Sequence, residues 1–395
     1  MGKVSTSQMA IVSDSRRLSS PIPITAISME DKTNEIIITG PRSNLFSNRK
    51  ILDSRDYRSL ADPKRVIFGI SWRPNLDNDL YNRHVDLHDE VSYPLSNTVV
   101  DYVSFVVNSP NILEFKKNLR QLPDAEDNVV DFLEEVLRSS HYLYSTIQNI
   151  EDGEAMFNDI LLYPFLKAVC VASNAGVPQF KVGETQLRAM SKKTNESEIE
   201  SDESTLYKAD GIMSFYGFNR LEVLLLETSG HFGSSDNSKS SFDHHKGLFG
   251  ALSMIKAIAD NYSFGSLETF KNVKVFFVHT AGKTVRLWSM RHVPEGPVYE
   301  LWLEQIYIIN PSFDERAEQV PLTIKFYWTL KCLIDETAKN LAALKQEHMK
   351  VISENALTSL PKDNLSTIIS CSMLKLTEEE DKSGMFRLGP FYTVQ

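Results

Sequence analysis

The chain has 395 residues, of which 42% are hydrophobic and 24% charged, a composition typical of a globular protein long enough for two domains. Its formal net charge of -10 excludes a protein that coats nucleic acid through a global positive field. Any binding of DNA or RNA is therefore expected to be local and modest.

The three cysteines, Cys170, Cys332 and Cys371, are widely separated. They show neither a CxxC pair nor zinc-ligand spacing, so neither a disulfide framework nor a zinc ribbon is predicted. No apolar segment reaches the length needed to span a bilayer, and the N-terminus lacks the apolar core of a secretion signal. We therefore expect an intracellular protein of the nucleus or cytoplasm, not secreted and without a membrane span. No oligomeric state is predicted.

The first 150 residues divide into two parts. Residues 1–60 are rich in Ser, Asn, Arg and Pro and are expected to form a mostly flexible N-terminal arm, with one short strand at EIIITG, Glu35–Gly40. Residues 61–150 are interpreted as a helical N-terminal region. Within it VIFGISW could be a strand, whereas VVDYVSFVV, ILEFKKNL and VVDFLEEVLRSSHYLYSTI carry apolar residues at helical spacing.

Residues 151–355 are predicted to form the core domain. Glu151–Ser173 has the apolar spacing of one long helix with a kink at Pro164. Lys192–Thr205 is polar and aperiodic, and is expected to be an exposed loop. Tyr207–Tyr216 and Leu221–Glu227 are expected to form two strands of a hairpin around the turn GFNR. The almost continuously apolar run LEVLLLE is typical of a central strand covered on both faces.

The second half of the core follows a Gly/Ser-rich loop, SGHFGSSDNSKSSF. Asp243 offers an N-cap for a helix over HHKGLFGALSMIKAIADNY. VKVFFVH and TVRLWSMRHV form a second hairpin around AGK, and VYELWLEQIYII is expected to be extended. A long helix from about Val320 to Ser353 ends the domain, and residues 356–395 form a C-terminal tail. The pattern predicts an α/β fold with a central mixed sheet flanked by helices.

Two carboxylates stand at the ends of core strands. Asp210 enters one strand and Glu227 leaves the next, where a carboxylate is costly to bury unless something binds it. Adjacent strands can bring such groups together, and with Glu154 on the preceding helix they offer the hard oxygen ligands that suit Mg²⁺ or Mn²⁺. An ion held there can activate water and stabilise the charge that develops on phosphate oxygens during phosphodiester hydrolysis.

The sequences ADG, Ala209–Gly211, and ETS, Glu227–Ser229, resemble the two half-motifs of the PD-(D/E)XK, or restriction-endonuclease-like, nuclease superfamily. Its usual core is a helix, a mixed sheet carrying the acidic residues, a helix packed on the sheet and a further strand. The stretch from Glu151 to about Glu304 also looks like a group of uncharacterised fungal proteins with this fold, although this covers under half of the chain. The resemblance implies a restriction-endonuclease-like core and a metal-dependent DNA or RNA nuclease with Glu154, Asp210 and Glu227 as metal ligands.

One position departs from the family pattern. Ser229 stands where the family has a lysine that orients or activates the attacking water and stabilises developing charge. Some members recruit the missing cation from the following helix, and Lys246 in DHHK is the candidate here, whereas Lys239 lies in the predicted loop and is expected to be less well held. If Lys246 points to solvent, a catalytically inactive module that binds nucleic acid or protein becomes the better interpretation.

The same acids also have structural interpretations. Asp210 before a glycine could form an Asx-type turn, and Glu227 could cap a turn. Glu154 could be a first-turn glutamate that is favoured by the helix dipole.

The histidines and aromatic residues give weaker signals. His244 and His245 lack a third zinc ligand at helical spacing and are predicted to lie in a solvated first turn of their helix, while His279 is predicted to be hydrogen-bonded rather than catalytic. No GxSxG elbow or P-loop is present, and AGKT, Ala281–Thr284, is more simply a hairpin turn. An aromatic group could stack on bases, but is expected to be core: Trp288, Tyr299, Trp302 and Tyr307.

Overall fold

A computed structural model describes residues 35–38, 67–70, 92–190, 207–293, 298–355 and 364–369. All of them belong to one compact unit, Thr33–Gln395. The predicted loop at 192–205 lies outside the described residues. Of the predicted arm at 1–60 only residues 35–38 are described, and of the tail at 356–395 only residues 364–369.

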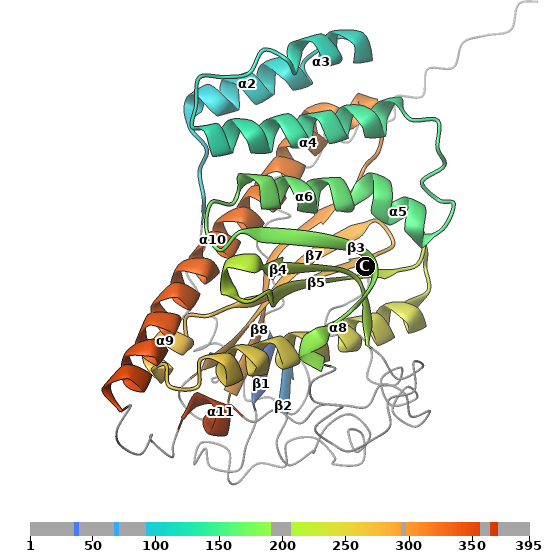
Figure 1. Ribbon diagram of the computed structural model, residues 1–395. Coiled ribbons are helices and arrows are strands. Elements are labelled where there is room, and N and C mark those ends of the chain that lie inside the picture. Colours follow the sequence, from blue (N-terminus) through green and yellow to red (C-terminus); the bar gives the residue numbers. More distant parts are fainter. Residues whose placement is uncertain are drawn as a thin grey trace, which may run out of the picture. The chain divides into compact units, whose positions relative to one another are not determined.

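One mixed sheet of eight strands forms the centre of this unit, in the order β2-β1-β8-β7-β6-β5-β4-β3 (Figure 1). Neighbouring strands are antiparallel except β5 and β6, which are parallel. The strands are β1 (Glu35–Ile38), β2 (Ile67–Ile70), β3 (Pro178–Gln186), β4 (Lys208–Phe215), β5 (Leu221–Ser229), β6 (Val275–Ala281), β7 (Thr284–Val293) and β8 (Val298–Ile308). The predicted α/β fold with a mixed sheet flanked by helices is confirmed.

Helices cover both faces of the sheet (Figure 1). They are α2 (Asn97–Val107), α3 (Ile112–Asn118), α4 (Asp127–Ser145), α5 (Glu154–Leu161), α6 (Tyr163–Ala172), α8 (Asn237–Asn261), α9 (Leu267–Phe270), α10 (Arg316–Glu354) and α11 (Leu365–Ile368). Consecutive side chains of a strand point to opposite faces. Accordingly, Thr228 on β5 bonds to Asn158 on α5, whereas Glu227 bonds to Lys246 on α8.

β5 is an interior strand of the sheet, as its apolar sequence predicts. All nine of its residues are buried, and it lies between β4 and β6. Both predicted hairpins are present. The turn between β4 and β5 contains a short 3-10 helix, η3 (Tyr216–Phe218), and ends at Asn219 and Arg220 with φ of 55° and 59°. The turn between β6 and β7 has Gly282 at φ 62°, a conformation that glycine adopts without strain.

The prediction of one kinked helix over Glu151–Ser173 is wrong. The chain breaks at Leu162 into α5 and α6, and Pro164 lies in the first turn of α6, where the N–H that proline lacks is not needed. The window Glu154–Ala172 is the one described stretch long and apolar enough to cross a membrane, and 61% of it is buried inside the protein, as in a core helix of a globular protein. The expectation that no apolar segment reaches spanning length is therefore wrong for this window, but its burial is consistent with the expectation of no membrane span.

α8 begins earlier than predicted. Its N-cap is Asp236, whose side chain accepts a hydrogen bond from the backbone N–H of Lys239 at 3.0 Å, so Asp243 lies inside the helix and not at its start. Part of the predicted Gly/Ser loop is therefore helical. Lys239, Asp243 and Lys246 are four and three residues apart, a spacing that places them on one face of the helix.

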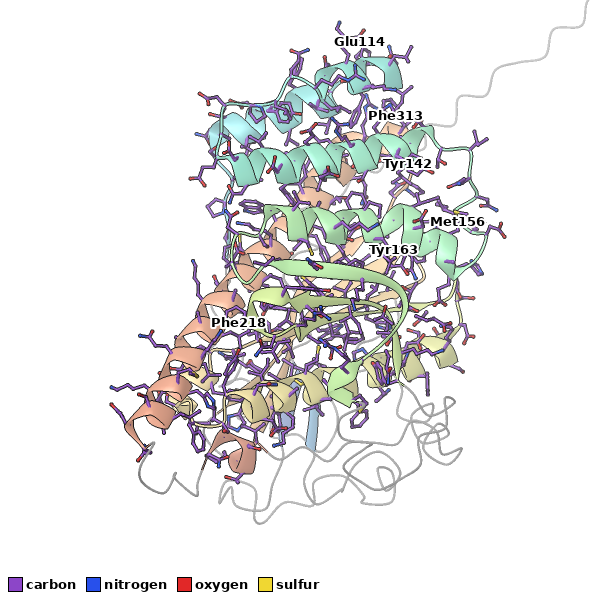
Figure 2. All side chains as sticks on the ribbon, viewed as in Figure 1. Glu114, Tyr142, Met156, Tyr163, Phe218 and Phe313 are labelled. Carbon is purple, nitrogen blue, oxygen red and sulfur yellow. The ribbon has the colours of Figure 1, made fainter. Side chains whose placement is uncertain are left out.

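β3 was not predicted from the sequence. Its residues PQFKVGETQ are largely polar, and it pairs only with β4, as an edge strand, with a bulge between Val182 and Thr185. Tyr163 at the start of α6, labelled in Figure 2, joins these strands. Its hydroxyl donates to the carbonyl oxygen of Asp210 at 2.9 Å and accepts from the backbone N–H of Gly183 at 3.2 Å.

Most of the remaining expectations hold. Residues 92–150 contain the three helices α2, α3 and α4, and α10 matches the predicted C-terminal helix but starts at Arg316. The short strands predicted near residues 35 and 67 are β1 and β2. Of the four aromatic residues predicted to be core, Trp288, Tyr299 and Tyr307 are buried and Trp302 is half-buried.

Candidate functional site

The two strand carboxylates lie next to each other. Asp210 is the third residue of β4, and Glu227 lies two residues before the end of β5. The register that pairs Gly211 with Leu226 places Asp210 opposite Glu227, and opposite residues of an antiparallel pair share one face of the sheet. Asp210 Oδ2 accepts the backbone N–H of Thr228 at 2.6 Å, so its side chain bonds across to β5.

Lys246 points to this pair and not to solvent. Its Nζ lies 2.7 Å from Glu227 Oε2, and the two side chains are 17% and 2% exposed. The Tyr207 hydroxyl lies 3.1 Å from Glu227 Oε1 and 2.8 Å from the carbonyl oxygen of Lys246, and its single proton can be donated to one of them at a time. The buried carboxylate of Glu227 is thus compensated by a buried ammonium group.

Lys239 is a second cation of the site. Its Nζ lies 3.0 Å from Glu154 Oε2, 3.0 Å from Asp243 Oδ2 and 3.1 Å from the carbonyl oxygen of Thr228. Glu154 is the first residue of α5, and its Oε2 also accepts the backbone N–H of Gly230 at 3.1 Å. The expectation that Lys239 lies in a loop is therefore wrong, because the early start of α8 brings it to these oxygens. Its side chain is nevertheless more exposed than that of Lys246, at 41% against 17%.

Ser229, in the place of the family lysine, takes part in a buried hydrogen-bond network. Its Oγ lies 2.9 Å from Asp243 Oδ2 and 3.1 Å from His279 Nε2. Burial, together with the charge of Arg286, lowers the pKa of His279 well below its usual value, so the ring is neutral. With the hydroxyl proton donated to Asp243, the Nε2–H tautomer of His279 can donate to Ser229. His279 is hydrogen-bonded, as predicted.

The carboxylates of the site outnumber its cations. Glu154, Asp210, Glu227 and Asp243, when ionised, carry -4 against +2 from Lys239 and Lys246, which leaves a formal charge of -2. An excess of negative charge is the condition that a divalent cation relieves.

Three of these acids have raised pKa values, and burial is the main cause. Burial and the nearby carboxylate of Glu154 raise the pKa of Asp210 to about 7, although the Thr228 N–H and Lys246 act in the opposite direction. Burial raises the pKa of Glu227 well above its ordinary value despite the adjacent Lys246. Burial likewise raises the pKa of Asp243, against the effect of Lys239.

The two lysines stay charged. Burial alone would lower the pKa of Lys246, but the carboxylates of Glu227 and Asp243 outweigh it and the pKa is raised. The pKa of Lys239 is also raised, because Asp243 and Glu154 outweigh the effect of burial. Both groups can therefore act as hydrogen-bond donors and as fixed positive charges, not as bases at neutral pH.

The prediction that His244 and His245 lie in a solvated turn is wrong. Both are fully buried, since the helix starts before them and they fall in its third turn. The ring of His244 lies 5.3 Å from that of Trp288, 5.5 Å from His279 and 5.8 Å from Phe277. His244 is thus part of the core beneath the site.

The oxygen ligands of the site suit a metal ion only in part. Among the described residues, no group of three or more His, Cys, Asp or Glu side chains is arranged to hold a metal ion. However, two carboxylate oxygens and a carbonyl oxygen already bind the ammonium group of Lys239. They are oxygen atoms of the kind that Mg²⁺ and Mn²⁺ prefer as ligands. The chemistry of these ligands fits Mg²⁺ or Mn²⁺, provided that Glu154 exchanges its lysine partner.

No protein-family model, curated protein or solved structure matches this chain. The fold and the site define an α/β protein with a mixed sheet and a partly buried cluster of acids and lysines at the ends of β4 and β5.

Proposed function

We propose that the protein is a metal-dependent phosphodiester hydrolase, a DNA or RNA nuclease with a restriction-endonuclease-like core. The observation that carries the proposal is the ammonium group of Lys246, which α8 places 2.7 Å from Glu227 beside Asp210. It supplies the positive charge that Ser229 cannot. The order α6, β3, β4, β5, α8, β6 also agrees with the helix, mixed sheet, helix and further strand of that superfamily.

Glu154, Asp210 and Glu227 are the proposed ligands of Mg²⁺ or Mn²⁺. When bound, the ion would supply a water of lowered pKa and stabilise negative charge on the phosphoryl oxygens. Lys246 donates hydrogen bonds to the attacking water and stabilises developing charge, a role that its raised pKa favours over that of a general base. Ser229 is a positioning residue, because it is 2% exposed and holds Asp243.

The test is cleavage of single- and double-stranded DNA and RNA with Mg²⁺ or Mn²⁺. Asp210→Asn, Glu227→Gln and Lys246→Met are each expected to lower the cleavage rate by about 100-fold or more, the size seen when one electrostatic stabiliser is removed. Asp159→Asn removes an exposed acid from the same helix as Glu154 and is expected to cleave at the wild-type rate.

Folding of the variants is the necessary control. Lys246→Met leaves Glu227 without its partner in a buried site, which can cost about 3–5 kcal/mol of stability. The double variant Glu227→Gln/Lys246→Met removes both charges, so it should unfold at a temperature closer to wild type and still not cleave. A wild type that cleaves none of the four substrates, or variants that cleave as fast as it does, would overturn the proposal.

A catalytically inactive protein of the same fold that binds nucleic acid or protein is the second candidate. Ser229 in the motif favours it, as does the lack of a three-ligand group among the described residues. The two candidates differ in one measurement. The inactive protein retains labelled DNA or RNA in a binding assay with Mg²⁺, with salt-dependent affinity, and releases no product over hours.

A further inference from the structure

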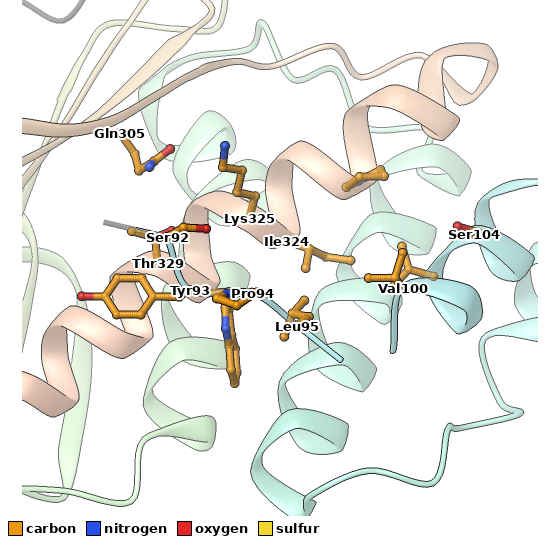
Figure 3. Close-up of a pocket in the computed structure, with 13 residues that line it drawn as sticks. Ser92, Tyr93, Pro94, Leu95, Val100, Ser104, Gln305, Ile324, Lys325 and Thr329 are labelled. Carbon is orange, nitrogen blue, oxygen red and sulfur yellow. The ribbon is translucent and has the colours of Figure 1, made fainter. Parts of the chain in front are cut away.

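A pocket distinct from the carboxylate site lies between α2, β8 and α10 (Figure 3). Its volume of about 320 Å³ is within the range of small-molecule sites. None of its lining residues belongs to the acid and lysine cluster, and it therefore needs an explanation of its own. The lining residues are Ser92, Tyr93, Pro94, Leu95, Val100, Val103, Ser104, Gln305, Pro321, Ile324, Lys325, Trp328 and Thr329.

The walls are apolar at depth. Val103, Ile324 and Trp328 line the pocket and are only 7%, 3% and 8% exposed, whereas Val100 at the rim is 50% exposed. Contact between apolar surface and water is unfavourable, so an apolar ligand that covers the surface at this rim is bound favourably.

Most of the polar groups gather at one end, and Ser104, next to Val100 at the other end, is the exception. In Figure 3 Gln305 and Lys325 lie together toward β8, while Leu95 and Val100 lie toward α2. Lys325 is the one charged side chain among the lining residues, and no acid lines the pocket. The cavity thus has one end that is mainly apolar and uncharged and another end that carries its positive charge.

Lys325 is available for a ligand. In the part of the chain that the structure describes, it has neither an ion-pair nor a hydrogen-bond partner. The acid next to Gln305, Glu304, is held by Lys274 at 2.7 Å and by Ser289 at 2.6 Å. The positive charge of the pocket is therefore not neutralised by that neighbour.

The frame of the pocket is fixed by contacts outside it. The Tyr93 hydroxyl donates to Glu336 at 2.8 Å and holds the segment before α2 against α10. The ring of Trp328 lies 5.3 Å from that of Phe132, and Lys331 lies 4.8 Å from the centre of the Trp328 ring. Because these walls are preformed, a ligand loses little free energy in ordering them.

We propose that this pocket binds a small free amphipathic carboxylate, such as a medium-chain fatty acid. The apolar chain lies against Val103, Ile324 and Trp328, and the carboxylate bonds to the ammonium group of Lys325. Gln305 is the second polar group beside that head. The proposal is independent of the nuclease activity, since it uses none of the residues of that site.

The test is calorimetric titration of the full chain with decanoate below its micelle concentration. Decanol and decyltrimethylammonium carry the same chain with no charge and with the opposite charge. Decanol is expected to bind about tenfold more weakly than decanoate, the size of a lost hydrogen bond to a charged group, and the cation more weakly still.

Three variants locate the site. Lys325→Glu is expected to weaken decanoate binding by about tenfold or more and to improve binding of the cation. Lys339→Glu reverses an exposed charge on the same helix outside the pocket and should leave both affinities unchanged. Val100→Trp fills the rim from an exposed position and should abolish binding without disturbing the core.

Four results of these titrations would overturn the proposal. Failure of decanoate to bind, equal binding of the anion and the cation, or unchanged binding by Lys325→Glu each overturns the proposal. Retention of decanoate by Val100→Trp would show that the ligand binds elsewhere and also overturns it.

Discussion

Lys239 holds its ammonium group 3.0 Å from Glu154 and from Asp243, so a group of the protein itself lies among oxygens that suit a metal ion. Its side chain is 41% exposed, more than twice the exposure of the Lys246 side chain at 17%, and it can leave toward solvent without crossing the core. A metal ion that uses Glu154 has to compete with this lysine. The two lysines of the site thus act differently, one fixed on Glu227 and one exchangeable.

Lys239→Met is expected to tighten Mn²⁺ binding by about tenfold, because it frees Glu154 and removes a positive charge a few ångströms from the ion. Titration calorimetry of the metal alone measures this without any substrate. Lys239→Arg keeps the charge and should bind like wild type, as should Lys271→Met, which removes an exposed lysine elsewhere. Equal affinity of Lys239→Met and wild type would show that Lys239 does not compete.

The sequence allowed part of this site to be predicted residue by residue. Asp210 and Glu227 are predicted from the pattern, because acids at the ends of apolar strands are visible in it. Lys246 is predicted from the resemblance to a family in which some members take the missing cation from the following helix. The sequence predicts Asp243 as a helix cap and Lys239 as a loop residue, and the structure places both inside α8. Lys239, Asp243 and Lys246 have helical spacing, but the serines around Lys239 indicate a loop. The helix can be predicted this early only if Asp236 is recognised as its N-cap.

At the scale of elements, the close approach of α8 to the sheet positions Lys246. A Cβ atom added to Gly247 would lie 2.1 Å from the ring of Phe277 on β6, so this position has no room for a side chain. The adjacent residue is Lys246, and any shift of the helix moves its ammonium group relative to Glu227.

Gly247→Ala is therefore expected to lower the free energy of unfolding by about 1–3 kcal/mol through overpacking. The higher helix propensity of alanine offsets part of this loss. The urea midpoint measures the loss. Phe277→Leu removes ring atoms from the clash, so the alanine should cost less in the Phe277→Leu background than in wild type. A double-mutant cycle without coupling between the two positions would contradict this packing.

The elements themselves differed in how well the sequence specified them. The strands β5 and β6 have continuous apolar runs that only buried strands of this length explain, and both were predicted. The edge strand β3 has only one buried residue of nine, so it lacks the apolar run that predicts β5 and β6. The sequence marks the break at Leu162 only through Pro164, which suits either a kink within one helix or the first turn of a new one, and apolar residues continue across the break.

For the molecule as a whole, the dependence of stability on pH has contributions from a buried histidine with a lowered pKa and a buried aspartate with a raised pKa. Burial lowers the pKa of His292 to about 4, between the rings of Phe270 and Tyr299. The folded state then binds fewer protons than the unfolded state between pH 4 and 6.5, so stability rises with pH in this window. This contribution is lost as the pH falls toward 4.

Asp210 acts in the opposite direction. Its pKa rises from 3.8 to about 7 on folding, so the folded state binds more protons than the unfolded state between these values. Its contribution is fully present below pH 3.8 and is lost as the pH rises through 7. Because the two side chains change the proton balance in opposite directions over most of the same pH range, their effects on the stability of the wild type largely cancel there.

Single substitutions should reveal how much each side chain contributes to the slope of the unfolding free energy against pH. In a chelating buffer, the stability of Asp210→Asn is expected to rise more steeply with pH than that of wild type between about 4.5 and 7, because the falling contribution of Asp210 is removed. His292→Phe fills the same aromatic surroundings without a titrating group, and its stability should rise less steeply with pH than that of wild type over that range. Urea unfolding at intervals of half a pH unit measures both slopes. If the two variants keep the slope of wild type, then folding changes the pKa of neither side chain, and Asp210 is an ordinary ionised carboxylate whose burial is fully compensated by Lys246 and the Thr228 N–H.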